Sequence, residues 1–257
     1  MLQQTQASRV VEFYSRWVKK FPSIAHLAAA PSSEVLRCWS GLGYNSRALR
    51  LHAAAKTTAS SRNKKLPSDP AELQLLPGIG KYTANAVACF AFKKNVPVVD
   101  VNIRRILTRL TVRVRSSAEM IDEKRAWQYA EQLLPRRSAY TWNQSLMDLG
   151  SQICTARRPG CAECPVSSLC RSAFAPCFVK NEKREKKKEP QWRGIPRRLI
   201  RGKILAFLHG QEATIEEIAA MLWGKVHGRD VAWLEGVLER MMQEGFIART
   251  KKRYRVA

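Results

Sequence analysis

Apolar residues recur at every third or fourth position along much of the chain between residues 8 and 154. This period is that of amphipathic α-helices, and the polar turns between the apolar stripes keep each helix short. No stretch in this region alternates between apolar and polar residues as a half-buried strand does. The predicted fold class is therefore mainly α, with helices over residues 8–20, 33–41, 46–59, 71–76, 83–92, 102–112, 118–134 and 138–154.

A second region follows the sequence KNEKREKKKE at residues 180–189, which contains no apolar residue and is expected to be a solvated linker. Three apolar-periodic stretches come next and then a short alternating hairpin. This order is typical of a winged helix, a small α+β module often used on DNA. The expected helices and strands are residues 197–208, 215–223, 231–243, 246–248 and 254–256.

The third of these helices is the one that would read a DNA groove in a winged helix. It carries Glu235 and Glu239, with Glu244 directly after it, against Arg240. Packing or a protein contact is therefore at least as well supported for this helix as groove reading.

The charge of the chain narrows the class of partner. Among 257 residues, 45 Lys and Arg face 21 Asp and Glu, which gives a net charge of +24. Such a surplus favours a polyanionic partner, most often nucleic acid. No apolar run reaches the roughly 18 to 20 residues that span a bilayer, and the first residues lack the pattern of a signal peptide. We expect no membrane partner and a cytoplasmic, nucleoid-associated protein.

Four of the seven cysteines have a spacing that suits a metal centre. Cys154, Cys161, Cys164 and Cys170 follow the pattern C-x6-C-x2-C-x5-C, and four close thiolates can surround an iron–sulfur cluster. A structural zinc site is the alternative, although zinc sites usually pair two C-x2-C knuckles and this segment has one. Cys177 falls outside the spacing and is expected to be free.

The segment LPGIGKYTA, residues 76–84, has the composition of a phosphate-binding hairpin. Gly78 and Gly80 leave the backbone amides uncovered, and the helix that begins near Lys81 adds its positive dipole end. A plain turn between two helices is the alternative. The basic composition and the aspartate downstream favour the anion site.

Asp100 ends an extended apolar run and stands two residues before Asn102, near the start of a helix. One interpretation is a structural N-cap. The other is an anion that stabilises an oxocarbenium-like sugar while a base departs, as carboxylates do in glycoside hydrolysis.

Several motifs in one order resemble a known family. They are MLQQTQ, WSGLGYNSRALRLHAAA, the hairpin with Asp100 and Asn102, WNQSLMDLGSQIC and the cysteine spacing. Together they resemble the helix-hairpin-helix (HhH-GPD) DNA glycosylases with an iron–sulfur cluster, in particular the MutY-type adenine glycosylases, over residues 1 to about 172. The resemblance favours a 4Fe-4S cluster over zinc, and a basic loop with Arg157 and Arg158 held out toward a phosphate backbone.

The resemblance also implies roles for individual residues. By this resemblance, the residues that contact a DNA phosphate are Gly78, Gly80 and Lys81. Asp100 matches the aspartate that lies at the flipped nucleotide, and Asn102 the polar residue that supports it. Tyr82 stands where the endonuclease III branch has its Schiff-base lysine, so no covalent lyase chemistry is expected. The residues that match the family's intercalating positions, and fill the gap left by the flipped nucleotide, are Gln3 and Tyr44; a core aromatic is the alternative for Tyr44.

Two departures from the family pattern bear on activity. The family's general acid, a glutamate, would lie two residues before Met1, so the chain is expected to be truncated at its start or to cleave slowly. The expected winged-helix-like unit also replaces the larger C-terminal domain with which MutY-type enzymes inspect oxidised guanine.

The expected domains are residues 1–153 (glycosylase), 154–172 (cluster loop), 173–195 (basic linker) and 196–257 (winged-helix-like). The predicted function is a monofunctional glycosylase, acting as a monomer on mismatched double-stranded DNA, that removes adenine opposite guanine or oxidised guanine. A thymine or uracil mismatch glycosylase and an impaired DNA-binding or regulatory protein are the alternatives.

Overall fold

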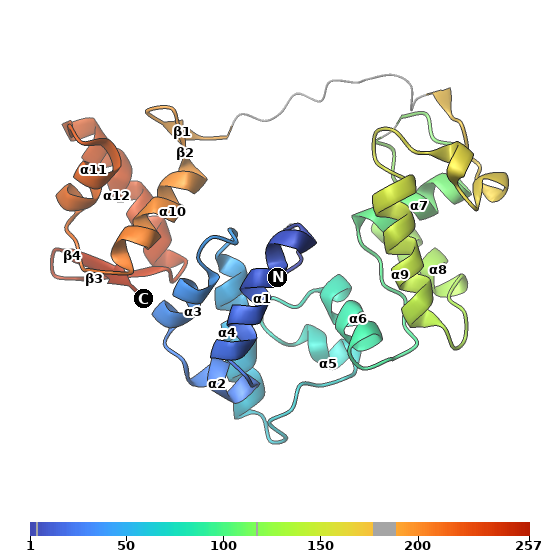
Figure 1. The fold of residues 1–257 in the computed structure, drawn as a ribbon, viewed down its shortest axis with the longest axis horizontal. Helices are drawn as coiled ribbons and strands as arrows, with labels where there is room; N and C mark the ends of the chain where they lie inside the picture. The colour runs from blue at the N-terminus through green and yellow to red at the C-terminus, as the bar shows by residue number, and fades with distance from the viewer. Residues whose placement is uncertain (4, 117, 177–188) are drawn as a thin grey trace. The chain divides into compact units, whose positions relative to one another are not determined.

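The computed structural model describes residues 1–3, 5–116, 118–176 and 189–257 (Figure 1). Helices dominate the described residues, as the sequence predicted. The first nine are α1 (Ala7–Lys20), α2 (Ile24–Ala29), α3 (Ser32–Trp39), α4 (Ser46–Ser60), α5 (Pro70–Gln74), α6 (Lys81–Phe90), α7 (Val101–Thr111), α8 (Glu123–Gln132) and α9 (Ala139–Asp148). No helix in the described ranges has both the length and the apolar character needed to cross a membrane.

The C-terminal region begins with two short strands, β1 (Gln191–Trp192) and β2 (Ile195–Pro196). The elements after them follow the predicted order: α10 (Arg197–Leu208), α11 (Ile215–Trp223), α12 (Gly228–Gln243), β3 (Ile247–Thr250) and β4 (Arg253–Val256). β3 and β4 form an antiparallel pair, and Ala213 bridges to Tyr254. Three helices followed by a hairpin confirm the winged-helix-like α+β module.

Three local features were not expected from the sequence. Helix α2 has only six residues and is capped by Ser23, too short for its apolar period to stand out. The pair β1–β2 has two residues in each strand. After α9 the chain continues as a π-helical turn, Leu149–Ile153, instead of an α-helix to residue 154.

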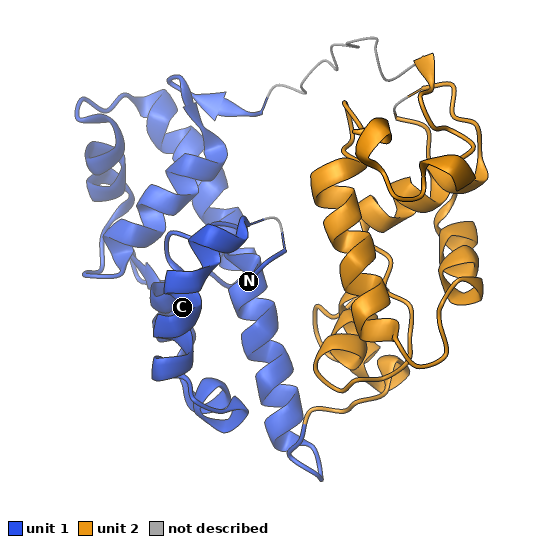
Figure 2. Cartoon of the chain, turned by 45° about the vertical axis from the view of Figure 1, so that its right-hand side comes forward, with its two compact units in different colours: residues 1–65, 186–257 blue, residues 66–185 orange. Residues whose placement is uncertain are grey.

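Contacts divide the chain into two compact units that do not follow chain order (Figure 2). Residues 1–65 and 186–257 form unit 1, and residues 66–185 form unit 2. The domain boundaries predicted from the sequence differ from this division and stay a prediction, because a contact unit can join two separately folding modules.

Unit 1 has one hydrophobic core to which both ends of the chain contribute. Trp17 and Trp39 from the N-terminal helices belong to the same buried cluster as Ile200, Leu234 and Met241 from the C-terminal module. The C-terminal module and the N-terminal helices therefore share one hydrophobic core.

Unit 2 holds the elements on which the sequence placed its chemistry. Its largest core cluster joins α7, α8 and α9 through Ile103, Ile106, Trp127 and Leu146. Helix α7 begins at the N-cap Asp100, and α8 begins at an aspartate cap as well. These caps fix where each helix starts and hence where its first residues point.

Candidate active site and cysteine cluster

The turn between α5 and α6 has the geometry that an anion site needs. The Ile79 amide donates to the Leu76 carbonyl at 3.2 Å, with Pro77 and Gly78 between them and Gly78 at φ +76°. This is the arrangement of a type II turn, which requires a positive φ at its third residue. Gly80 is the N-cap of α6, and a Cβ built on it would meet nothing within 4 Å. Gly80 and Lys81 are exposed, so the start of α6 lies at the surface, as phosphate binding requires.

Lys81 begins α6 beside this turn. It is exposed, and its Nζ lies 4.3 Å from the centre of the Trp127 ring on α8. This cation–π contact fixes the amine against α8 while leaving it open to solvent.

Tyr82 lies close to Asp100. Burial, and next the negative charge of Asp100, raise the pKa of the Tyr82 phenol. The phenol therefore stays protonated at neutral pH.

The Asp100 carboxylate is held at both oxygens. Oδ1 accepts a hydrogen bond from the Ile103 amide at 2.7 Å, and Oδ2 accepts one from Nδ2 of Asn102 at 3.0 Å. The N-cap interpretation is thus correct for one oxygen. The side chain remains partly exposed, so a capped carboxylate with fixed orientation is still available to a ligand.

Arg105 connects Asn102 to the segment that carries the first cysteine. Its guanidinium donates to Oδ1 of Asn102 at 2.9 Å, to the Gly150 carbonyl at 2.7 Å and to the Cys154 carbonyl at 2.9 Å. The residue is buried, with 7% of its surface exposed. Gly150 lets the π-helical turn approach α7, because a Cβ there would lie 2.9 Å from Cβ of Asn102. A continuous chain of contacts therefore runs from the cysteine segment to the carboxylate of Asp100.

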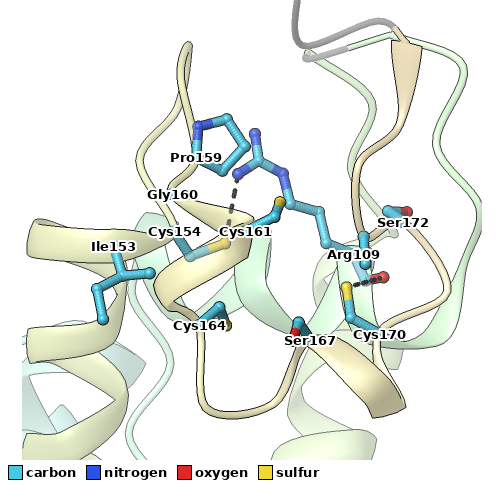
Figure 3. Close-up of a pocket in the computed structure, with 11 residues that line it drawn as sticks. Arg109, Ile153, Cys154, Pro159, Gly160, Cys161, Cys164, Ser167, Cys170 and Ser172 are labelled. Carbon is cyan, nitrogen blue, oxygen red and sulfur yellow. Dashed lines mark hydrogen bonds between the residues drawn. The ribbon is translucent and has the colours of Figure 1, made fainter.

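The four cysteines of the predicted spacing line one pocket (Figure 3). Arg109 lies at this pocket and donates to Sγ of Cys154 at 3.3 Å, while the Cys170 thiol donates to the Arg109 carbonyl at 3.2 Å. The other two cysteines that line the pocket are Cys161 and Cys164.

The pocket fits an iron–sulfur cluster better than a single zinc ion. Within the described residues, no three Cys, His, Asp or Glu side chains are placed to hold one metal ion, whereas a zinc site needs its ligands to converge on one point. In a cluster each thiolate binds a different iron, so the sulfur atoms stand apart around it. Burial, and then the charges of the other three cysteines, raise the pKa of the Cys170 thiol.

The remaining predicted residues are also placed. Arg157 and Arg158 are exposed in the loop between the first two cysteines. Gln3 and Tyr44 are exposed in unit 1, and Tyr44 has 62% of its surface accessible. This exposure rules out the core-aromatic alternative for Tyr44. Cys177 lies outside the described residues.

Sequence reasoning missed three arginines that organise these segments. Arg105 and Arg109 are buried on α7, and Arg47 binds the segments of both Gln3 and Tyr44. A signal was present for two of them, since Arg105 and Arg109 stand four residues apart among the apolar residues of α7, where an unpaired charge is unfavourable.

Comparisons with known proteins agree with this geometry. The family model of the HhH-GPD superfamily base excision DNA repair protein matches residues 1–132, and that of the iron–sulfur binding domain of endonuclease III matches residues 154–170. The cofactor is accordingly a 4Fe-4S cluster, which confirms the prediction.

Individual relatives extend the match. The adenine DNA glycosylase of Mycolicibacterium smegmatis is 38% identical over 258 residues, covering 97% of this chain and 82% of the relative. The adenine DNA glycosylase of Mus musculus is 41% identical over 173 residues, covering 67% of this chain and 34% of the relative. A solved thermostable thymine-DNA glycosylase superposes with a TM-score of 0.59 at 29% identity, covering 69% of this chain and 80% of that structure. The chain therefore belongs to the HhH-GPD superfamily of base excision DNA repair proteins, within its adenine DNA glycosylase family.

Proposed function

We propose that this protein is a base excision repair glycosylase that removes adenine mispaired with guanine or oxidised guanine from duplex DNA. The relatives named adenine DNA glycosylases support the base, and the +24 net charge supports the DNA partner. The observation that carries the chemistry is the Asp100 carboxylate, fixed at the start of α7 by two hydrogen bonds and close to Tyr82.

The proposed reaction is hydrolysis of the N-glycosidic bond after the nucleotide is swung out of the stack. Positive charge develops on the sugar as the base departs, and the Asp100 carboxylate stabilises it electrostatically. Because Asn102 and the Ile103 amide fix the carboxylate beforehand, little reorganisation is needed in the transition state.

The proposed chemistry stops at an abasic site because a tyrosine, and not a lysine, stands next to Lys81 at the start of α6. Tyr82 occupies the position expected for a Schiff-base lysine. The neighbouring Lys81 amine rests against the ring of Trp127. A phenol kept protonated by its surroundings is a poor nucleophile, so a covalent intermediate is not expected.

Residues of both units contact DNA in this proposal. In unit 2 the amides of the turn at Gly78 and Gly80, with Lys81, bind one phosphate, and Arg157 and Arg158 contact the backbone. In unit 1 Gln3 and Tyr44 enter the duplex to replace the flipped nucleotide.

The cluster has a structural role in this proposal. The four ligands are Cys154, Cys161, Cys164 and Cys170. When bound, the cluster crosslinks the loop of residues 154–170 and so holds the basic residues of that loop in place. Arg109 contacts two of the four ligand residues, which ties the loop to α7.

We further propose that one chain acts alone on nucleoid DNA, since the residues assigned to phosphate contact and base flipping, together with Asp100, all belong to a single chain. Sedimentation of the protein with an uncleavable duplex tests this. A complex with one protein per duplex is expected, and a complex with two protein chains would contradict it.

The preferred mismatch is identified with a set of end-labelled duplexes that differ only at one base pair: A·G, A·oxidised G, A·T, T·G and U·G. Enzyme in excess and alkali treatment report base removal. Strand breaks are expected in the two adenine mismatches and not in A·T. Breaks confined to T·G and U·G would assign the chain to thymine or uracil removal, the alternative favoured by its similarity to a thymine-DNA glycosylase structure. Tight binding of every mismatch without any strand break would identify the chain as a DNA-binding protein without glycosylase activity.

A further inference from the structure

Arg47, near the start of α4, joins two segments that are far apart in the sequence. One nitrogen of its guanidinium donates to the Met1 carbonyl at 2.8 Å and to the Gln3 carbonyl. The other donates to the Thr5 hydroxyl at 3.0 Å and to the Gly43 carbonyl at 3.1 Å. A single side chain therefore holds Met1, Gln3 and Thr5 against the loop between α3 and α4.

The loop that Arg47 holds carries a conformation that needs support. Tyr44 has φ +48°, a left-handed backbone that costs a residue other than glycine roughly 1 kcal/mol or more. The Arg47 guanidinium lies 5.6 Å from the Tyr44 ring and 5.3 Å from the Trp39 ring. Nε1 of Trp39 donates to the same Gly43 carbonyl at 3.1 Å. The loop is thus fixed by two donors at one carbonyl and by contacts of the guanidinium with two rings.

Charge pairing does not explain the place of Arg47. Its partners are carbonyl and hydroxyl oxygens, and no carboxylate in the described part of the chain forms an ion pair with it. The side chain is only partly exposed. A planar fork with several donors satisfies four oxygens at once, whereas a lysine at this position could satisfy fewer in less defined directions.

We infer that Arg47 is a positioning residue that presents Gln3 and Tyr44 as one rigid wedge to the duplex. The inference rests on the proposed function, in which these two residues fill the gap left by the flipped nucleotide. Two side chains on separate flexible segments would each lose conformational freedom on binding, and prior fixing by Arg47 removes much of that cost. Arg47 therefore acts on mismatch binding and base flipping and not on the bond that breaks.

The test is a double-mutant cycle with Arg47→Gln and Tyr44→Ala in the full chain. Affinity is measured for a mismatched duplex with an uncleavable adenine analogue, and flipping is followed by the fluorescence of 2-aminopurine at the target position. Arg50→Gln is the matched control, since Arg50 is exposed on the same helix and its loss removes the same charge.

Each single variant, Arg47→Gln or Tyr44→Ala, is expected to weaken mismatch binding by about tenfold and to reduce the 2-aminopurine signal. If Arg47 acts through Tyr44, the double variant binds within about twofold of the weaker single variant, and Arg47→Lys recovers part of the loss. Arg50→Gln is expected to leave the fluorescence change intact. Circular dichroism melts verify that each variant is folded. If Arg47→Gln does not fold, Arg47→Lys takes its place as the test variant.

The outcomes separate the inference from the proposed function. If Gln3→Ala and Tyr44→Ala both bind and flip like the parent, the assigned wedge is wrong and the inference fails with it. If those variants are impaired but Arg47→Gln behaves like Arg50→Gln, only the inference is wrong. Independent, multiplying effects of Arg47→Gln and Tyr44→Ala would also overturn it.

Discussion

Replacing Arg105 by glutamine should loosen the catalytic carboxylate from a distance. Arg105 donates three hydrogen bonds of 2.7 to 2.9 Å, to Asn102, Gly150 and Cys154. A hydrogen bond from a charged donor contributes about 1.5 to 3 kcal/mol, and a buried acceptor left without a donor costs about 1 to 3 kcal/mol. Because these terms are not additive and glutamine restores one contact, we expect a loss of about 3 to 5 kcal/mol in the free energy of unfolding of unit 2.

The effect on catalysis is smaller and has a different cause. Asn102 loses the contact that fixes its side chain, so the Asp100 carboxylate keeps the Ile103 amide but is held less firmly at its second oxygen. A tenfold slower single-turnover cleavage corresponds to about 1.4 kcal/mol in the barrier, which is the size of one weakened hydrogen bond. We expect a reduction of about 10- to 100-fold.

The assay combines three measurements on Arg105→Gln and on the control Arg113→Gln, which changes an exposed arginine just after α7. Urea unfolding reports stability, iron and sulfide content reports the cluster, and single-turnover cleavage reports catalysis at the same cluster occupancy. The control should match the parent in all three. An Arg105→Gln protein with full cluster content, parent stability and parent rate would refute the account of this contact chain.

Three further predictions concern the remaining residues. With Tyr82 in place of a lysine, the product strand should stay intact until alkali is added and borohydride should trap no covalent complex; efficient trapping would show that an amine reaches the sugar. Lys81→Gln should reduce the magnitude of the log–log salt slope of binding by about 1, whereas an unchanged slope would place Lys81 away from phosphate. The purified protein should be brown and contain iron and sulfide; a colourless protein with one zinc after anaerobic reconstitution would contradict the cluster assignment, and loss of Cys161 should release the cofactor.

The sequence predicted those features that depend on neighbours along the chain. Helix α7 was foreseen because Asp100 caps an apolar period that begins at Ile103. The turn at Gly78 was foreseen because only a few residue types suit a positive φ there. The four ligand cysteines were foreseen because a short spacing limits how far apart their thiols can lie.

What could not be foreseen depends on contacts between distant segments. Arg47 reaches Met1 across 46 residues, and Arg105 reaches Cys154 across 49 residues; periodicity carries no information about such pairs. The shared core of unit 1, in which Trp39 and Met241 belong to one cluster, is non-local in the same way. This shared core also changes how the C-terminal module should be studied, since deleting residues 180–257 would expose buried apolar surface on α1–α4. Charge changes on its surface test DNA contact more cleanly.

The central claim is that Asp100 carries the reaction and does not merely cap α7. Asparagine is as good an N-cap as aspartate, so Asp100→Asn keeps the hydrogen bond to the Ile103 amide and the fold while removing the negative charge. The decisive measurement compares single-turnover removal of adenine opposite oxidised guanine by the parent and by Asp100→Asn, together with the affinity of each for the uncleavable duplex. The account predicts affinity within about twofold and cleavage reduced by about 10² or more. Cleavage by Asp100→Asn at the parent rate would contradict it.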